Sequence, residues 1–579
     1  MSILNTKQRQ RLIINKDILM PFNPTKEQEL IFNFFHKGKG HGMIDAVAGS
    51  GKTTTIIQGI SYIDSNKQIL FCAFNKKIQL EIHKKTNDYD NVIVRTTYAL
   101  GLNILKHSYD VIGYKAPNTS KYYHILNNKL KRKKDSYEYE KPSKFTLIFD
   151  KIRDHYYRLK KQDEVDNFYK IFYSNYYKLT DLMRYTLYFS QGVNKFKLLI
   201  EKYGIDINSD DKQITELYLE FIELVIEEGI NQATEKGVYD FADMIFLPCH
   251  LKLKARHHYD IVFVDECQDL SNAQLKVITK HIKKQGRLFA VGDPFQSIYG
   301  FAGASEKSFN NIQQTFEPSM FKLTNCFRCD KKIIELAKEI RTDITTMNTN
   351  EGSVEKIQFN EIIEHARQSD YVLSRSNSDL FDVVFEFLKV NIKCKIIGKT
   401  EILKELKNLV PNKKLYDEYY FENLVEHLEN IFKAAKVKLG NNPANFDKLE
   451  NLRDSINILE TCYFNSDDTN NLDQLFKFIE KLMDGKDEDS VILSSIHKAK
   501  GLEANRVFIL EYNNLPRKIE GMLDWQIYQE KCLKYVAITR AKNTLFLVEP
   551  LPEKNQIFMK NNEVIDMCDL DDDIDNLAI

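Results

Sequence analysis

Two widely separated segments constrain this chain more than any other feature. Residues 44–55 read IDAVAGSGKTTT and residues 261–270 read IVFVDECQDL. In the first, an apolar run, a glycine turn and a lysine predict a strand that leads through a tight turn into a helix. Backbone N–H groups of such a turn, and the positive end of the helix dipole, bind phosphate oxygens. The first segment therefore predicts a phosphate-binding loop.

The residues of this loop suit a nucleoside triphosphate. Lys52 can reach the outer phosphates and Thr53 can hold Mg²⁺. Ala46 stands where the G-x-x-x-x-G-K-[ST] pattern has its first glycine. A plain glycine turn before an ordinary helix is the alternative, but it does not account for Lys52-Thr53. The residues expected to contact the nucleotide here are Ala48, Gly49, Ser50, Gly51, Lys52, Thr53 and Thr54.

The second segment supplies the acidic half of such a site. Asp265 and Glu266 directly follow the apolar run Ile261–Val264, at the end of a predicted strand. One carboxylate there can bind the metal and the other can orient a water molecule for attack on the phosphate. Together the two segments predict hydrolysis of ATP, or of a close relative of ATP, with Mg²⁺.

Composition limits the class of protein. The chain has 579 residues, 43% hydrophobic and 28% charged, with 82 basic and 82 acidic side chains, which fits a globular protein of several domains. No apolar run is long enough for a membrane helix, and residues 1–10 lack the apolar core of a secretory signal. We therefore expect no membrane partner and an intracellular location, in cytoplasm or nucleus. The wealth of lysine, asparagine and isoleucine indicates an A+T-rich genome, such as that of a large DNA virus or a compact microbe.

The order of apolar runs predicts the fold class. Strands are expected at residues 42–47, 68–74, 92–96, 260–264 and 287–291, and again at 353–359, 370–374, 393–397, 490–494, 506–510 and 544–548. Strands that alternate with helical stretches indicate parallel α/β sheets. Within the first group of strands, residues 98–237 have a helical pattern and almost no glycine. Within the second group, residues 401–488 are largely helical in pattern and rich in charge. We therefore predict an α/β protein with two parallel-sheet domains, each interrupted by a mainly helical insertion.

Five further segments follow in a fixed order. They are AVGDPFQSIYGFAGAS (290–305), LTNCFR (323–328), VLSRSN (372–377), SSIHKAKGLEANRVFIL (494–510) and KYVAITRAKNTLFLV (534–548). With the two nucleotide segments they resemble the UvrD/Rep-like branch of superfamily 1 helicases, closest in style to the F-box DNA helicase group. The resemblance implies two RecA-like domains with ATP bound between them. The expected parts are 1–97 and 238–323 for the first domain, 98–237 for its insertion, 324–400 and 489–552 for the second domain, 401–488 for its insertion, and 553–579 for an acidic tail.

The resemblance also implies roles at the nucleotide. Asp265 would bind the metal directly or through a metal-bound water, Glu266 would position and activate the attacking water, and Gln296 would sense the γ-phosphate. Arg328 and Arg540 resemble paired arginine fingers, which stabilise charge on the transferred phosphoryl group. For both arginines the alternative is a surface ion pair. Around the base and ribose the resemblance implies Gln28 and Phe327 at adenine and Glu503 at the ribose. A solvated helix glutamine is the alternative for Gln28, and a helix cap is the alternative for Glu503.

Single-stranded DNA, or DNA with a single-stranded tail, is the substrate that the resemblance implies, with RNA as an alternative. Phe301 stands where the family places an aromatic ring that stacks on a base, and the alternative is a core aromatic. Ala302 replaces the arginine expected next to it. The remaining candidates for contact with nucleic acid are Phe74, Asn75, Thr96, Tyr98 and His497.

The resemblance implies a DNA-dependent ATPase that moves 3′→5′ along a single strand and separates strands, in DNA repair, replication or recombination. One alternative is a translocase that strips proteins from DNA without processive unwinding, because the second insertion is short. Another is a nucleotide-gated clamp without catalysis, but the chain retains Glu266 and both arginines. The sequence identifies no protein partner.

Overall fold

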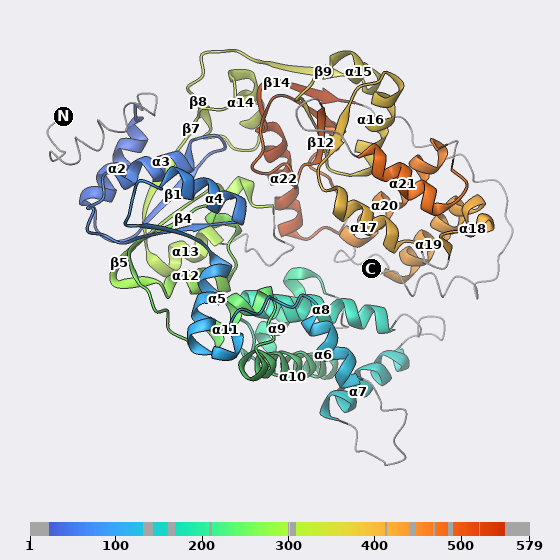
Figure 1. The fold of residues 1–579 in the computed structure, drawn as a ribbon, viewed down its shortest axis with the longest axis horizontal. Coiled ribbons are helices and arrows are strands. Elements are labelled where there is room, and N and C mark those ends of the chain that lie inside the picture. The colour runs from blue at the N-terminus through green and yellow to red at the C-terminus, as the bar shows by residue number, and fades with distance from the viewer. Residues whose placement is uncertain are drawn as a thin grey trace. The chain divides into compact units, whose positions relative to one another are not determined.

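The computed structural model describes residues 23–549 except 131–142, 160–167, 206, 208–210, 299, 301–307, 411–413, 440–445, 467–468, 484–489 and 520. The chain divides into two compact units. The first takes its described residues from 1–135, 180–190 and 223–327, and the second from 136–179, 191–222 and 328–579. Each unit is built around one parallel sheet (Figure 1).

The sheet of the first unit has six strands in the order β3-β2-β4-β5-β1-β6, and all pairings are parallel. Its strands are β1 (Gly42–Ala46), β2 (Ile69–Ala73), β3 (Val92–Thr96), β4 (Tyr259–Val264), β5 (Ile282–Gly292) and β6 (Ser319–Leu323). Successive residues of a strand point to opposite faces of the sheet, and because strands such as β2 and β4 are almost continuously apolar, both faces are apolar. Ile44 and Phe263 pack on one face, while Met43 and Val262 pack on the other.

Helices cover both faces of this sheet. Side chains of α2 (Lys26–Lys37), α3 (Lys52–Ile60) and α4 (Lys76–Lys85) join the core with Ile44. Side chains of α5 (Thr97–Ser108), α11 (Phe241–His250), α12 (Asn272–Thr279) and α13 (Ser308–Phe316) join the core with Met43. This is the layered arrangement of an α/β domain, and the carboxyl ends of β1, β4 and β5 lie on one edge.

The sequence between β3 and β4 is helical. Besides α5 and α11 it contains α6 (Lys121–Leu130), α7 (Lys144–Leu159), α8 (Phe168–Thr186), α9 (Val193–Tyr203) and α10 (Lys212–Lys236). A buried ionic network fastens part of it to the first unit. The Lys121 ammonium lies 2.5 Å from a carboxylate oxygen of Asp243, and the Arg184 guanidinium lies 2.9 Å from the other. All three side chains are almost completely buried, so each charge is compensated by its partners.

The second unit contains a sheet of six parallel strands in the order β11-β12-β10-β13-β14-β9. The strands are β9 (Ser353–Ile357), β10 (Tyr371–Ser374), β11 (Cys394–Ile396), β12 (Val491–Ser495), β13 (Ala504–Leu510) and β14 (Ala541–Val548). Helices α14 (Lys331–Ala337), α15 (Ile362–His365), α16 (Ser378–Lys389) and α22 (Asp524–Ile538) belong to the same unit. A short pair, β7 (Asn325–Cys326) with β8 (Thr345–Thr346), completes the described strands.

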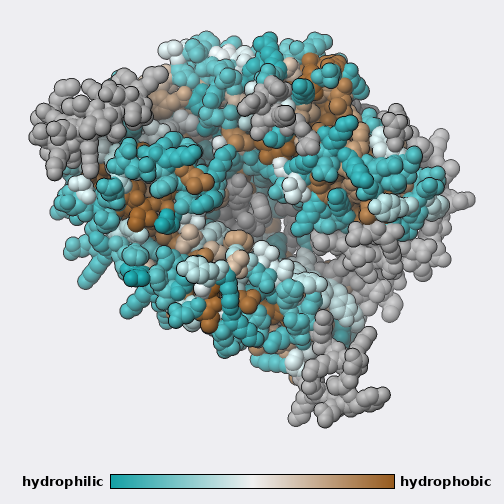
Figure 2. Space-filling view, viewed as in Figure 1, coloured by the Kyte–Doolittle hydropathy of each residue, from teal (hydrophilic) through white to brown (hydrophobic). Residues whose placement is uncertain are grey.

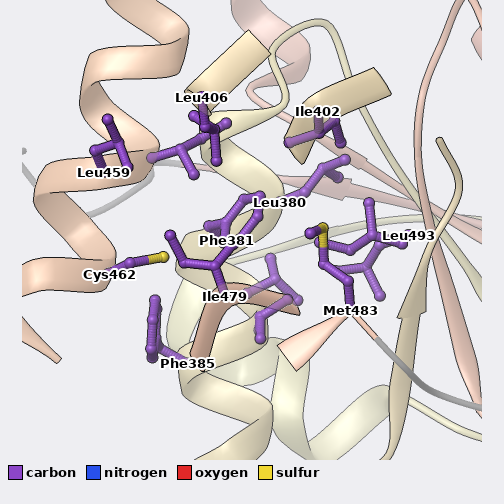
Figure 3. Packing of buried hydrophobic residues seen from close by; sticks show 14 of the residues in the cluster. Leu380, Phe381, Phe385, Ile402, Leu406, Leu459, Cys462, Ile479, Met483 and Leu493 are labelled. Atoms are coloured by element: carbon purple, nitrogen blue, oxygen red, sulfur yellow. The ribbon is translucent and has the colours of Figure 1, made fainter. Parts of the chain in front are cut away.

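The helical insertion of the second unit shares its core with the sheet. It comprises α17 (Lys399–Asn408), α18 (Glu418–Glu422), α19 (Leu424–Leu439), α20 (Phe446–Phe464) and α21 (Leu472–Leu482). Figure 3 shows Phe381 of α16 among Leu406 of α17, Leu459 of α20 and Ile479 of α21, with Leu493 of β12 in the same cluster. The insertion is therefore packed as part of the second unit.

The strand predictions are confirmed in position, and the α/β class with two parallel sheets is confirmed as well. β6, β7 and β8 were not expected from the sequence. The domain boundaries predicted from the sequence remain proposals.

In Figure 2 the visible face is largely hydrophilic, with apolar residues in scattered patches. None of the described helices is both long and apolar enough to cross a lipid bilayer.

Candidate functional site

The loop between β1 and α3 has the backbone that its glycines predict. Gly49 has φ of 66° and Gly51 has φ of 73°, in the left-handed region that side chains with a Cβ rarely adopt. Two backbone hydrogen bonds hold the loop in place: Val47 N donates to Leu323 O, and Phe327 N donates to Gly49 O, each at 2.9 Å. The loop is thus tied to the end of β6 and to the segment after it.

The start of α3 is suited to an anion. Gly51 is the N-cap residue and supplies no side-chain hydrogen bond, so the first amides of the helix are left to other acceptors. The Ser50 hydroxyl oxygen is buried, and it makes no hydrogen bond within the part of the chain that the structure describes. A buried hydroxyl without a partner is costly, and phosphate oxygens would satisfy it. Lys52 and Thr54 lie in the first turn of the same helix.

One hydrogen bond joins the two sequence segments from which the prediction started. Thr53 Oγ1 donates to Asp265 Oδ2 at 2.8 Å. Asp265 is 3% exposed, and burial together with the neighbouring Glu266 carboxylate raises its pKa. A divalent cation would offset both effects, because it replaces lost hydration and neutralises like charge. A hydroxyl beside a buried carboxylate is therefore a donor set that fits Mg²⁺.

The remaining catalytic candidates of the first unit lie at the ends of β4 and β5. Glu266 follows β4 after one residue and has φ of 52°, so its backbone is in the left-handed region. Gln296 is 4% exposed, and its side-chain amide donates to Asp293 Oδ2 at 2.6 Å. β4 and β5 are neighbours in the sheet, which brings these candidates to the same edge as Asp265.

Gln28 is buried at 2% exposure, so it is not a solvated helix glutamine. Its Oε1 accepts from Thr25 N at 3.0 Å in the capping box of α2. Its Nε2 donates to Thr55 Oγ1 of α3 at 2.9 Å. In this arrangement Gln28 connects α2 to the helix of the phosphate loop.

Phe327 presents an aromatic surface beside the phosphate loop. It is 44% exposed, although it is a large apolar residue. Its Cδ2 lies 4.0 Å from the point where a Cβ on Gly51 would stand. An exposed ring in contact with the loop suits stacking on a flat base.

The candidates of the second unit form one cluster. Arg328 Nε lies 2.5 Å from Glu503 Oε2, and Arg328 also donates to Thr539 O at 3.0 Å. Lys542 Nζ lies 2.8 Å from the other oxygen of Glu503. Against the opposing effect of burial, Arg328 and Lys542 lower the pKa of Glu503. Glu503 therefore carries a negative charge between two cations.

Arg540 belongs to the same cluster but is 1% exposed. Its guanidinium donates to Val536 O and to Leu502 O, each at 3.0 Å. It also donates to Thr539 Oγ1 at 3.4 Å, so Thr539 contacts both arginines. Arg540 is therefore buried and not a surface residue, whereas Arg328 does form an ion pair with Glu503, whose side chain is 39% exposed, as the alternative from the sequence proposed.

The candidates for contact with nucleic acid are more scattered. Asn75 and Thr96 are N-cap residues whose side chains accept from Ile78 N and Ala99 N, and Phe74 precedes Asn75 with partial exposure. The Tyr98 ring packs against Phe241 at 6.2 Å between centroids, and its hydroxyl bonds to Tyr185, so packing holds this residue. Phe301 and Ala302 lie outside the described residues.

His497 lies in the segment after β12. Burial and the nearby Arg375 lower its pKa to about 3. The imidazole is therefore neutral at physiological pH and can contact a phosphate only as a hydrogen-bond donor, not as a cation.

Several residues of the site were not singled out from the sequence. Gln268 and Asp293 stand in DECQD and GDPFQ, the very motifs that were recognised, but their side chains gain a role only where β4 and β5 meet. Lys542 and Thr539 flank Arg540 in the motif AITRAK. The only signal in the sequence that could have pointed to these four residues was their position next to residues of recognised motifs.

Comparison with known proteins gives the same assignment as the geometry. A family model described as the UvrD/REP helicase N-terminal domain matches residues 25–317. A second, described as the UvrD-like helicase C-terminal domain, matches residues 400–549. Neither match bears on the likeness to the F-box group, which stays a prediction.

Individual relatives are distant. An ATP-dependent DNA helicase Rep of Buchnera aphidicola is 26% identical over 322 residues, which cover 52% of this chain and 43% of the relative. A component of an ATP-dependent helicase/nuclease from Natranaerobius thermophilus is 27% identical over 36% of this chain and 18% of the relative. An ATP-dependent DNA helicase PcrA of Staphylococcus aureus is 22% identical over 42% of this chain and 37% of the relative. The chain thus spans less than half the length of each of these relatives.

Proposed function

The chain belongs to the UvrD/REP helicase family, and from this premise we propose that it is an ATP-dependent DNA helicase. We propose further that it hydrolyses ATP with Mg²⁺ and moves 3′→5′ along single-stranded DNA to separate strands. The names of the relatives from Buchnera and Staphylococcus, both ATP-dependent DNA helicases, support the activity. The polarity rests on the resemblance of the motifs.

The observation that carries this proposal is the hydrogen bond from Thr53 to Asp265. It joins the phosphate loop after β1 to the acidic end of β4, although the two residues are 212 positions apart. In the proposed site the amides at the start of α3 and the Ser50 hydroxyl bind phosphate oxygens. Lys52 neutralises the outer phosphates, and Thr53 and Asp265 hold Mg²⁺, which would draw charge from the phosphate oxygens when bound.

Hydrolysis needs a water molecule activated at the γ-phosphate and stabilisation of the charge that develops there. We assign the first task to Glu266 and the sensing of the γ-phosphate to Gln296. Arg328 and Arg540 supply positive charge to the transferred phosphoryl group, a contribution of about 10³–10⁵ in rate for an arginine finger. Phe327 stacks on adenine, Gln28 reads its edge, and Glu503 holds the ribose.

The DNA would be held mainly by stacking and by backbone contacts. An aromatic ring binds any base, so Phe301 gives grip without reading sequence, at about 1–3 kcal/mol per base. Asn75, Thr96 and His497 are neutral hydrogen-bonding groups, which suits contact with sugar and phosphate during movement. A translocase that removes proteins from DNA is the second candidate, and the brevity of the second insertion favours it.

The test is ATP hydrolysis by the purified chain and by Lys52→Ala. We expect Lys52→Ala to abolish phosphate release, since the loop would lose its charge facing the outer phosphates. Lys37→Ala is the matched control, because Lys37 is an exposed lysine in the last turn of α2. Turnover by Lys52→Ala at the level of Lys37→Ala would refute the assignment of the phosphate loop.

A further inference from the structure

Gln268 is a buried glutamine between the two catalytic strand ends. It lies in the 3-10 turn Cys267–Asp269 after β4 and is 2% exposed. Its Nε2 donates to Glu266 Oε2 at 2.5 Å. Its Oε1 accepts from the backbone N–H of Asp293, directly after β5, at 3.0 Å. One side-chain amide thus bridges the end of β4 to the end of β5.

The bridge continues to the proposed γ-phosphate sensor. Asp293 is completely buried, and its carboxylate accepts from Phe295 N at 3.0 Å and from Gln296 Nε2 at 2.6 Å. Glu266, Gln268, Asp293 and Gln296 therefore form one line of hydrogen bonds, called here the glutamine relay. Gln268 contacts the backbone N–H of Asp293, whereas Gln296 contacts its carboxylate, so the relay passes through the backbone and side chain of this one residue.

The backbone fixes the orientation of this amide. The N–H of Asp293 can only donate and a carboxylate of Glu266 can only accept, so the Gln268 oxygen must face the former and its NH₂ the latter. Gly292 makes room for this: a Cβ there would stand 2.3 Å from Gln268 Oε1. The glycine of the GDPFQ motif is thus required by the close approach of the relay.

We propose that Gln268 is a positioning residue for ATP hydrolysis, which holds the carboxylate of Glu266 in register with Gln296. The inference rests on the proposed function, since it gives Gln268 its task through the roles of Glu266 and Gln296. A hydrogen bond to one carboxylate oxygen restricts rotation of the carboxylate group. Partners that orient a catalytic or metal-binding group typically contribute about 10- to 100-fold to activity.

Two substitutions remove the bridge in different ways. Gln268→Glu keeps the shape but sets a carboxylate against those of Glu266 and Asp269, so the contacts that the NH₂ group made become repulsive. Gln268→Met keeps much of the length and adds no charge, and it removes the two hydrogen bonds of the bridge together with a longer one from Nε2 to Asp269 Oδ2 at 3.4 Å. The residues proposed to bind the nucleotide and Mg²⁺, Lys52, Thr53 and Asp265, lie outside the relay. For both variants we therefore expect kcat for ATP to fall about 10- to 100-fold, with nucleotide affinity within about threefold of wild type.

Gln274→Glu is the matched control. Gln274 is a glutamine of the same unit at 7% exposure, and its Oε1 accepts from Ser271 N at 2.8 Å. Its Nε2 donates to the Thr97 hydroxyl, which can equally donate to a carboxylate. The same isosteric change is therefore tolerated there, and we expect wild-type kcat.

A double-mutant cycle separates positioning from general support of the fold. If Gln268 acts through Gln296, Gln268→Met and Gln296→Ala together should cost about as much in kcat as the worse single variant. Wild-type kcat in Gln268→Met, additive losses in the double variant, or equal losses of kcat and nucleotide binding would each overturn the relay. A wild-type chain that does not hydrolyse ATP would refute the proposed function itself, and the relay would fall with it. A wild-type chain that hydrolyses ATP while Gln268→Met matches it would refute the relay alone.

Discussion

At the scale of single residues, the groups proposed to bind ATP and the groups proposed to act on it have different hydrogen-bond partners. The Asp265 carboxylate accepts from the Thr53 hydroxyl of the phosphate loop, whereas the Glu266 carboxylate accepts from Gln268. Glu266→Gln should therefore keep ATP affinity and lower kcat by about 10²–10⁴, the usual contribution of a general base. The measurement is equilibrium binding of ATP beside single-turnover hydrolysis. Glu317→Gln is the control, because Glu317 is an exposed glutamate of the same unit. A collapse of ATP affinity in Glu266→Gln would show that Glu266 has a structural role.

Arg540 calls for a different substitution because it is buried and bonded to backbone carbonyls. Arg540→Ala would leave these carbonyls without a partner, at a cost of about 1–3 kcal/mol, and so mix stability with catalysis. Arg540→Lys keeps the charge but loses the planar, forked donor. We expect Arg540→Lys to fold and bind ATP but to hydrolyse it at least about tenfold more slowly, in steady-state assays that separate kcat from KM. Arg341→Lys is the control, because Arg341 is another fully buried arginine of the same unit. Equal effects of the two variants on kcat would show that Arg540 has no specific role in catalysis.

At the scale of elements, one carboxylate of the second helical insertion caps a helix outside the insertion. Asp454 of α20 accepts from Asn377 N at 2.9 Å and from Ser378 N at 2.6 Å, at the start of α16. Asn377 provides no side-chain cap of its own, so Asp454 caps α16 from another helix. Asp454→Ala should destabilise the start of α16 by about 1–3 kcal/mol.

Hydrogen exchange is the measurement for this prediction, because a chain of two units does not have one defined free energy of unfolding. We expect the amides at the start of α16 to exchange faster in Asp454→Ala, while those of β1 in the other unit keep their protection. Asp473→Ala is the control: Asp473 forms an i,i+4 ion pair with the exposed Lys477, and such pairs contribute little. Unchanged exchange in α16 would show that the shared core alone holds the insertion.

The elements also show what local sequence can and cannot predict. β1 and β4 are apolar runs next to recognised motifs, and their positions followed directly. β6 was missed because Ser319–Leu323 is an edge strand with β1 as its described partner, and a single buried residue leaves little pattern. β5 begins earlier than its apolar run, because Ile282 pairs with Tyr259 before the register shifts.

At the scale of the whole molecule, the residues proposed to bind phosphate could be recognised from local sequence, whereas the contacts that connect the candidate residues could not. Lys52 and Asp265 could be recognised from short motifs. The contacts of Gln268 with Asp293, and of Arg328 with Glu503, join segments that only the sheet order brings together. The burial of Arg540 and Gln28 likewise follows from packing and not from their motifs.

The proposed function includes binding of DNA, and we expect residues 301–302 to influence the affinity. Ala302 offers no cation beside Phe301, so stacking should carry more of the affinity than usual. Phe301→Ala should weaken binding of a single-stranded oligonucleotide by about 1–3 kcal/mol, while ATP hydrolysis without DNA stays near wild type. Ala302→Arg should tighten binding and steepen its dependence on salt, because an added phosphate contact releases a counterion. Equal affinity of Phe301→Ala and wild type, in fluorescence anisotropy titrations, would remove Phe301 from the DNA site.

The central claim is that this chain converts ATP hydrolysis into movement along single-stranded DNA. The most direct measurement is strand separation of a short duplex with a 3′ single-stranded tail, beside the same duplex with a 5′ tail, with ATP hydrolysis followed in the same samples. We predict that single-stranded DNA stimulates hydrolysis, that the 3′-tailed duplex is separated faster, and that Lys52→Ala does neither. Hydrolysis that ignores single-stranded DNA, with neither duplex separated, would contradict the account.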